Sequence, residues 1–126
     1  MQEAPKNRIV VAEDDPSISA MLHKVLSQFY EVIVTHDGAS ALAVAGKAPP
    51  PDLLLLDVMM PGMDGHAVAS AVRKLPGLKS IPIIFLTAKT GPSEVIKGIQ
   101  SGARHYITKP FKIDDLTQRV KKALGG

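Results

Sequence analysis

The 126-residue chain is long enough for one domain with a buried core and too short for two. Hydrophobic residues make up 45% and charged residues 21%, which excludes a disordered chain; no apolar run approaches the ~18 residues of a membrane-spanning helix, and the N-terminal MQEAPKNR lacks the apolar core of a signal peptide. The formal net charge is +3. The chain contains no cysteine, which excludes disulfides and thiolate metal sites and leads us to expect a cytoplasmic protein.

The hydrophobic pattern predicts five strands in chain order. They are RIVVA (8–12), EVIVT (31–35), DLLLLD (52–57), PIIFLT (82–87) and RHYIT (104–108). The first, third and fourth are short apolar runs, which are typical of strands buried on both sides, and EVIVT is rich in β-branched residues.

A helix-period pattern follows each of these strands. The first helix starts at Asp15-Pro16, a capping residue before a helix-starting proline, and its apolar stripe runs through Phe29. Asp37-Gly38 opens an alanine-rich helix, and Asp64 caps a third; KAPPP (47–51) predicts a stiff connector between them. The last two helices are indicated by the stripes Val95, Ile96 and Ile99, and Ile113, Leu116, Val120 and Leu124.

This alternation predicts an α/β fold. Strands too apolar to have a solvated face require a parallel sheet covered by helices on both sides. Right-handed crossovers with one reversal of the strand order give a doubly wound, five-stranded, flavodoxin-like (βα)5 sheet. We expect the strand order 2-1-3-4-5.

Polar side chains gather where the predicted strands end. The first strand ends at Glu13-Asp14-Asp15, the third at Asp57 and the fourth at Thr87, and Lys109 follows the fifth. In this fold class, ligands bind beyond the carboxyl ends of the strands, so these groups should face one another across a crevice. Asp15 and Asp64 are interpreted as helix caps instead.

This set of groups predicts metal-assisted phosphoryl chemistry. Glu13, Asp14 and Asp57 bring a charge of −3, and Lys109 returns +1. Carboxylates without nearby histidine or cysteine suit Mg²⁺, or Mn²⁺, and the bound cation would leave room for one more anion beside Asp57. A carboxylate nucleophile with a metal, a lysine and a hydroxyl around it indicates phosphoryl transfer to aspartate.

The chain resembles the receiver domains of two-component response regulators, of the chemotaxis response regulator type. The resemblance covers residues 7–124, within a single domain spanning 1–126, and rests on four segments in the right order and spacing. These are IVVAEDDPSI, PDLLLLDVMMPGMDG, PIIFLTAKT and GARHYITKPF.

The resemblance implies a role for each site residue. Asp57 would be the phosphoacceptor, Asp14 a direct metal ligand, Glu13 a ligand through water, and the backbone carbonyl of Met59 a further ligand. Lys109 would pair with the phosphoryl oxygens, and its bond to the following proline would be cis. Thr87 and Tyr106 would form the switch pair. The side chains of Met59 and Met60 are expected to pack within their loop.

The resemblance also implies partners. A sensor histidine kinase or phosphotransfer protein would supply the phosphoryl group. An output protein or domain would respond to the surface of the fourth helix, fifth strand and fifth helix. The domain would be a signalling switch rather than a turnover enzyme, promoting only its own phosphorylation and slow dephosphorylation. It would act either alone or as part of a longer regulator.

One segment departs from the family pattern. Winged-helix regulators usually have GADDY before the fifth strand, where this chain has GARHY. Arg104 and His105 therefore replace acids that would pair with a second subunit. This departure argues against the dimer that those regulators form through the fourth and fifth helices, and the sequence leaves the oligomeric state open.

Three rival functions fit the residues less well. A flavodoxin-like electron carrier needs a phosphate-cradling loop after the first strand, and EDDP would repel phosphate. A haloacid-dehalogenase-type phosphatase needs a second aspartate two residues after the nucleophile, where Met59 stands. A degenerate receiver that signals without phosphate would not need the acidic pair, Thr87 and Lys109.

The charge distribution suggests no further partner. Residues 1–85 hold seven Lys/Arg and nine Asp/Glu, a balance of −2, and residues 86–126 hold eight and three, a balance of +5. No zinc-finger spacing, basic zipper or RNA-binding aromatic pair accompanies the basic part. We expect a solvated basic face, with no direct nucleic-acid binding by this domain and no membrane contact.

Overall fold

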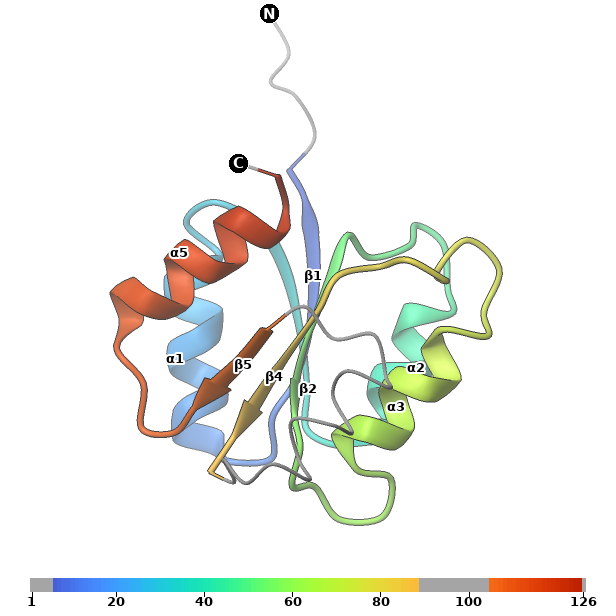
Figure 1. Ribbon diagram of the computed structural model, residues 1–126, viewed down its shortest axis with the longest axis horizontal. Coiled ribbons are helices and arrows are strands. Elements are labelled where there is room, and N and C mark those ends of the chain that lie inside the picture. The colour runs from blue at the N-terminus through green and yellow to red at the C-terminus, as the bar shows by residue number, and fades with distance from the viewer. Residues whose placement is uncertain (1–5, 89–104, 126) are drawn as a thin grey trace, which may run out of the picture.

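The five predicted strands form one parallel sheet in the predicted order. The computed structural model describes residues 6–88 and 105–125. The strands are β1 (Arg8–Ala12), β2 (Glu31–Thr35), β3 (Leu53–Asp57), β4 (Ile83–Thr87) and β5 (His105–Thr108), arranged β2-β1-β3-β4-β5 (Figure 1). All four pairings are parallel. From β1 the chain adds β2 on one side and then β3 on the other, so the order of strand addition reverses between β1 and β3. The carboxyl ends of these two strands therefore flank the switch point of the sheet.

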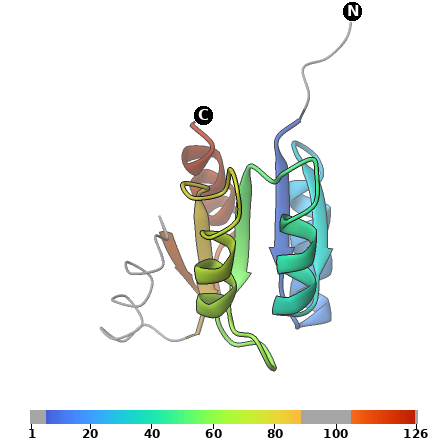
Figure 2. The same cartoon turned by 90° about the vertical axis from the view of Figure 1, so that its right-hand side faces the viewer.

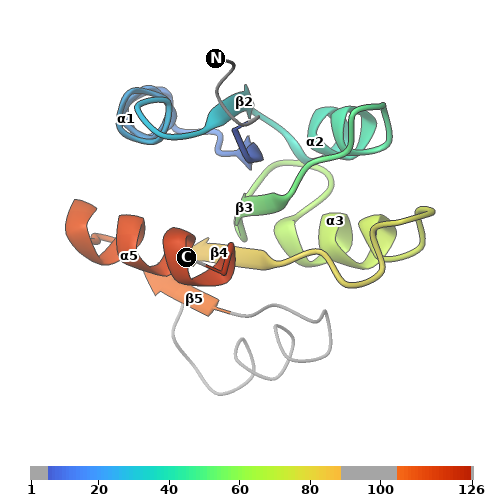
Figure 3. The same ribbon diagram turned by 90° about the horizontal axis from the view of Figure 1, so that it is seen from above.

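Helices cover both faces of the sheet, as predicted. The described helices are α1 (Pro16–Leu26), α2 (Gly38–Ala45), α3 (Gly65–Val72) and α5 (Ile113–Ala123). Seen from above, α1 and α5 lie on one face and α2 and α3 on the other (Figure 3), and the side view shows α2 and α3 in front of the sheet (Figure 2). The predicted helix with Val95, Ile96 and Ile99 lies outside the described residues.

Alternation along the strands divides the core into two clusters. On β3, Leu53 and Leu55 pack toward α1 and α5, while Leu54 and Leu56 pack toward α2 and α3. All four leucines are inaccessible to solvent. Because successive strand residues point to opposite faces, an unbroken run of leucines fits only a strand buried on both sides. This burial holds the carboxyl end of β3, and Asp57 with it, in a fixed position.

Three aspartates start the helices that follow the strands. Asp15 accepts hydrogen bonds from the backbone N–H groups of Ser17 and Ile18, which confirms it as the cap of α1. Asp64 accepts one from Ala67 at 2.8 Å, which confirms it as the cap of α3, and Asp37 caps α2. Asp15 therefore uses one of its carboxylate oxygens to start α1.

The first helix is shorter than its apolar stripe suggested. It ends at Leu26, where the carbonyl accepts hydrogen bonds from the N–H groups of Phe29 and Tyr30 in a closing turn. This turn brings the chain back to β2, and it points Phe29 outward with 63% of its surface exposed. The prediction that Phe29 continues the buried stripe was wrong.

No helix in the described part of the chain combines the length and the hydrophobicity that crossing a lipid bilayer requires.

Candidate functional site

The acids of β1 and β3 meet at the carboxyl edge of the sheet. In the register of these strands Ala12 pairs with Leu56, so Glu13 and Asp57 stand side by side at the next step. Glu13 is fully buried, Asp57 is 3% exposed, and Asp14 is exposed. One carboxylate oxygen from each of the three lies within 4.8 Å of the others. Among the described residues this is the one such group of potential metal ligands.

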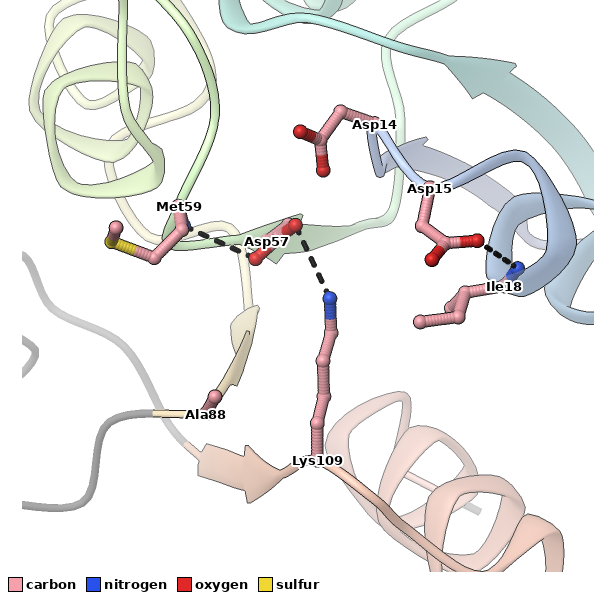
Figure 4. Close-up of a pocket in the computed structure, with 7 residues that line it drawn as sticks. All are labelled: Asp14, Asp15, Ile18, Asp57, Met59, Ala88 and Lys109. Atoms are coloured by element: carbon pink, nitrogen blue, oxygen red, sulfur yellow. Dashed lines mark hydrogen bonds and ion pairs between the residues drawn. The ribbon is translucent and has the colours of Figure 1, made fainter.

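Lys109 extends from the end of β5 into this acidic group (Figure 4). Its ammonium nitrogen lies 2.6 Å from Glu13 Oε1 and 3.2 Å from Asp57 Oδ2. Its backbone N–H donates to the carbonyl of Thr87 at 2.9 Å, which fixes the start of the side chain. Burial alone would lower the pKa of Lys109, but the two carboxylates outweigh it and raise that pKa. The lysine is therefore held in its charged form.

The contact between Lys109 and Glu13 was not anticipated from the sequence. The lysine was expected to pair with a phosphoryl group, and Glu13 to contact a metal through water. With three carboxylates close together, the ammonium nitrogen lies nearest to the most deeply buried one. The only sequence signal for this pairing is that both residues follow strands whose ends converge.

The two carboxylate oxygens of Asp57 have different surroundings. Oδ1 accepts a hydrogen bond from the backbone N–H of Met59 at 3.1 Å, and Oδ2 faces Lys109. Burial first, and then the neighbouring Glu13, raise the pKa of Asp57 from its ordinary value, and the smaller lowering by Lys109 and the Met59 N–H leaves that pKa at about 7. A second cation in the site would favour the ionised form, since positive charge stabilises a carboxylate.

The protonation of Asp57 makes a testable contribution to stability. Its folded-state pKa of about 7 lies above the ordinary value of 3.8, so this group's contribution is full at low pH and is lost as the pH rises toward 7. In the presence of a chelator, Asp57→Asn should therefore stabilise the protein more at pH 8 than at pH 5, by about 1 kcal/mol after allowing for solvent screening. Urea denaturation at the two pH values measures the difference, and an equal effect at both would contradict the assignment.

A cavity of about 420 Å³ opens beside Asp57 (Figure 4). The side chain of Met59 is 54% exposed at this cavity, so the prediction that it packs within its loop was wrong. Met60 is buried, as predicted. The difference follows from alternation after β3, which turns Met60 toward the core and Met59 toward the site. The lining residues are Asp14, Asp15, Ile18, Asp57, Met59, Ala88 and Lys109.

Gly65 lets the start of α3 approach the backbone of Asp57. Its N–H donates to the carbonyl of Val58 at 3.1 Å, and a Cβ placed on it would lie 2.5 Å from the carbonyl oxygen of Asp57. No side chain fits there without moving the backbone of one of the two elements. The glycine therefore sets the position of the loop between β3 and α3.

Gly65→Ala should consequently destabilise the protein by about 2–3 kcal/mol, as expected when added volume forces backbone shifts. Gly46→Ala is the matched control, because the nearest atom to its Cβ would be 3.6 Å away. Thermal denaturation of both variants tests this, and equal stabilities would contradict the close approach.

Thr87 and Tyr106, the predicted switch pair, lie on neighbouring strands. Thr87 is buried at the end of β4, one residue beyond Leu86, which pairs in register with Asp57. Tyr106 is half-buried, and its ring centroid lies 5.3 Å from that of Phe85 and 6.4 Å from that of His66. Thr87 therefore ends on the edge that carries the site, and the Tyr106 ring packs on the face covered by α2 and α3.

Two features around this pair and Lys109 complete the description. The bond between Lys109 and Pro110 is cis, as the family resemblance implied, and that between Ala48 and Pro49 is also cis. The guanidinium of Arg119 on α5 donates to the backbone carbonyl of Tyr106 at 3.1 Å. Sequence reasoning did not single out Arg119, because its helical position shows no link to β5.

The fold and the site define a doubly wound α/β protein with three carboxylates and a lysine at the switch point of its sheet. Residues 9–121 match the family model described as the response regulator receiver domain. The chain therefore belongs to the receiver domain family of response regulators.

Known relatives are regulators of this kind. The chain is 43% identical over 120 residues to the DNA-binding response regulator MtrA of Mycolicibacterium smegmatis, an alignment covering 94% of this chain and 51% of MtrA. The chain thus spans about half the length of the MtrA proteins that it matches.

Solved structures show the same architecture. The chemotaxis protein CheY4 of Vibrio cholerae superposes with a TM-score of 0.89 at 34% identity, covering 94% of this chain and 98% of that one. The receiver domain of the sensor histidine kinase PA1611 of Pseudomonas aeruginosa has a TM-score of 0.86 at 27% identity, covering 98% and 100%. The latter structure has a magnesium ion coordinated in its active-site cleft.

Proposed function

We propose that this domain is a phosphorylation switch in which Asp57 accepts a phosphoryl group. The observation that carries the proposal is the position of the Asp57 carboxylate, which lies at an open cavity between two further acids and a lysine. The Met59 N–H holds one of its oxygens at 3.1 Å, which orients the carboxylate. Orientation of a reacting group by fixed donors is a main source of rate enhancement.

The donor set fits a hard divalent cation. Glu13, Asp14, Asp57 and the backbone carbonyl of Met59 would hold Mg²⁺, or Mn²⁺, and carboxylate and carbonyl oxygens are the ligands these ions prefer. The bound ion would neutralise charge that develops on the transferred phosphoryl oxygens. The exposed position of Asp14 suits direct ligation at the cavity.

The chain's own residues would carry out the transfer. A carboxylate oxygen of Asp57 attacks the phosphorus of a phosphohistidine; the P–N bond breaks and its electron pair returns to the imidazole nitrogen. Lys109 then faces the phosphoryl oxygens, because its ammonium already lies 3.2 Å from Asp57. The aspartyl phosphate is a mixed anhydride, so water returns Asp57 to its free form by hydrolysis.

The response would pass through Thr87 and Tyr106. The Thr87 hydroxyl moves toward the phosphoryl oxygens, and the Tyr106 ring takes the space that this movement leaves. A phosphoryl group can shift this equilibrium only through contacts that differ between the two states. A histidine kinase or phosphotransfer protein would supply the phosphoryl group, and an output protein or domain would recognise the altered surface near β5 and α5.

Phosphorylation by a small donor tests the proposal without knowledge of the kinase. The purified chain is incubated with acetyl phosphate and Mg²⁺, and its intact mass is measured over time. We expect a gain of one phosphoryl group that requires Mg²⁺ and disappears after hydrolysis. No gain with Mg²⁺, or an equal gain with EDTA, would contradict the proposed switch.

A further inference from the structure

Three aromatic rings from three elements meet on the face of the sheet that α2 and α3 cover. His66 stands in the first turn of α3, Phe85 in β4 and Tyr106 in β5. The ring centroid of His66 lies 4.6 Å from that of Phe85 and 6.4 Å from that of Tyr106, and the centroids of Phe85 and Tyr106 are 5.3 Å apart. Tilted rings at such separations attract one another beyond the effect of their burial. The three rings therefore form one cluster.

The backbone of Tyr106 is held from two directions. Tyr106 pairs in register with Phe85 on β4, and its carbonyl accepts a hydrogen bond from the Arg119 guanidinium at 3.1 Å. With its backbone fixed in this way, the residue changes the position of its ring by rotation of the side chain between rotamers. The rings that contact the side chain therefore decide which rotamer is favoured.

The two rings beside Tyr106 have different surroundings. Phe85 is inaccessible to solvent, so it is a fixed part of the core. His66 is half-buried, at the border between the core and solvent. Its backbone follows Gly65, whose N–H donates to the carbonyl of Val58 at 3.1 Å. The His66 ring is thus presented to Tyr106 from a helix start that is anchored to the loop after β3.

The contact with His66 favours one of the two Tyr106 positions in the proposed switch. In that switch the Tyr106 ring moves into the space that Thr87 leaves, and Thr87 is buried at the end of β4. The ring would then exchange its contact with His66 for contacts deeper in the protein. A contact made in only one of two states stabilises that state and opposes the transition to the other.

We propose that His66 is a positioning residue that holds the Tyr106 ring against Phe85 and thereby sets the threshold of the switch. This inference rests on the proposed function, because it concerns the regulation of that same site. Loss of the His66 ring moves Tyr106 toward the space beside Thr87. By linkage, the domain then binds a phosphoryl mimic more tightly, by about 3-fold for an aromatic contact of this kind.

Binding of beryllium trifluoride with Mg²⁺, measured by isothermal titration calorimetry, tests the linkage. His66→Ala should bind the mimic about 3-fold more tightly than the wild type, and His66→Phe, which keeps a ring in the cluster, should bind it like the wild type. His23→Ala is the matched control, because it changes an exposed histidine of α1 on the other face of the sheet (Figure 3). In a Tyr106→Ala background, His66→Ala should have no effect. Wild-type affinity of His66→Ala, or an equal effect in that background, would overturn the proposal.

Fluorine NMR follows the Tyr106 ring without any phosphoryl mimic. The chain has two tyrosines, so Tyr30→Phe leaves Tyr106 as the one site for 3-fluorotyrosine. A soluble gadolinium chelate should relax this fluorine less in His66→Ala than in the parent, because the ring spends more time in the buried space beside Thr87. If His66 merely covered the ring, its removal would make the relaxation stronger.

The two measurements separate this inference from the proposed function. A wild type that binds no beryllium trifluoride would contradict the proposed switch, and the fluorine relaxation would still show whether His66 holds the Tyr106 ring. Circular dichroism melting shows that each variant is folded. Unchanged or stronger relaxation in a folded His66→Ala variant would overturn the role of His66, even in a chain that binds the mimic.

Discussion

An Asp57→Asn variant is expected to gain no phosphoryl group from acetyl phosphate and Mg²⁺. The amide has nearly the shape of the carboxylate but lacks the nucleophilic oxygen, so the loss should be complete rather than partial. The variant should remain folded and, in chelator, should be more stable than the wild type above pH 7, because the folded-state pKa of Asp57 is raised to about 7. Intact-mass spectrometry and urea denaturation of the same preparation measure the two effects.

Asp64→Asn is the matched control for this substitution. Asp64 is exposed and caps α3 through the N–H of Ala67, a role that asparagine also fills. This variant should be phosphorylated like the wild type. A phosphoryl group appearing on Asp57→Asn at the wild-type rate would show that another residue accepts it.

Lys109→Met is expected to affect metal binding and phosphorylation in opposite directions. The ammonium lies 2.6 Å from Glu13 and 3.2 Å from Asp57, so its removal leaves three carboxylates without their internal cation. Mg²⁺ should then bind more tightly, by about 10-fold, since a competing positive charge is gone. The rate of phosphorylation should fall by about 100-fold or more, because the phosphoryl oxygens lose their counter-charge. Isothermal titration calorimetry and mass spectrometry measure the two changes.

Lys112→Met serves as the control for Lys109→Met. Lys112 is exposed just before α5, and its side chain makes no capping hydrogen bond there. Its replacement should leave both Mg²⁺ affinity and phosphorylation close to the wild-type values. Equal or weaker Mg²⁺ binding by Lys109→Met would mean that the lysine does not compete for the acidic site.

The sheet could be predicted in detail because its three central strands, β1, β3 and β4, have no polar face. Leu53–Leu56 are accommodated only in a strand buried on both sides, and the alternation with helices then restricts the connections to right-handed crossovers. The confirmed order placed Glu13 and Asp57 on neighbouring strands. Their convergence at the switch point could thus be inferred before any coordinates.

Features that depend on side-chain direction could not be predicted. The helical period continues to Phe29, but the chain turns back at Leu26 to reach β2, and periodicity does not encode where a turn begins. Met59 follows the buried strand directly, and only the path of its loop shows that it faces the cavity. The pairing of Lys109 with Glu13 depends on which carboxylate is the more buried, and that is a property of the packed site.

A crystal structure of this chain grown with Mg²⁺ and beryllium trifluoride, a phosphoryl mimic, tests the central claim most directly. Our account predicts one divalent ion held by oxygens of Asp14 and Asp57, with Glu13 beside it. It also predicts the beryllium group on an Asp57 oxygen and Lys109 turned from Glu13 toward the fluorides. An Asp57 carboxylate directed away from Asp14, with no ion between them, would contradict it.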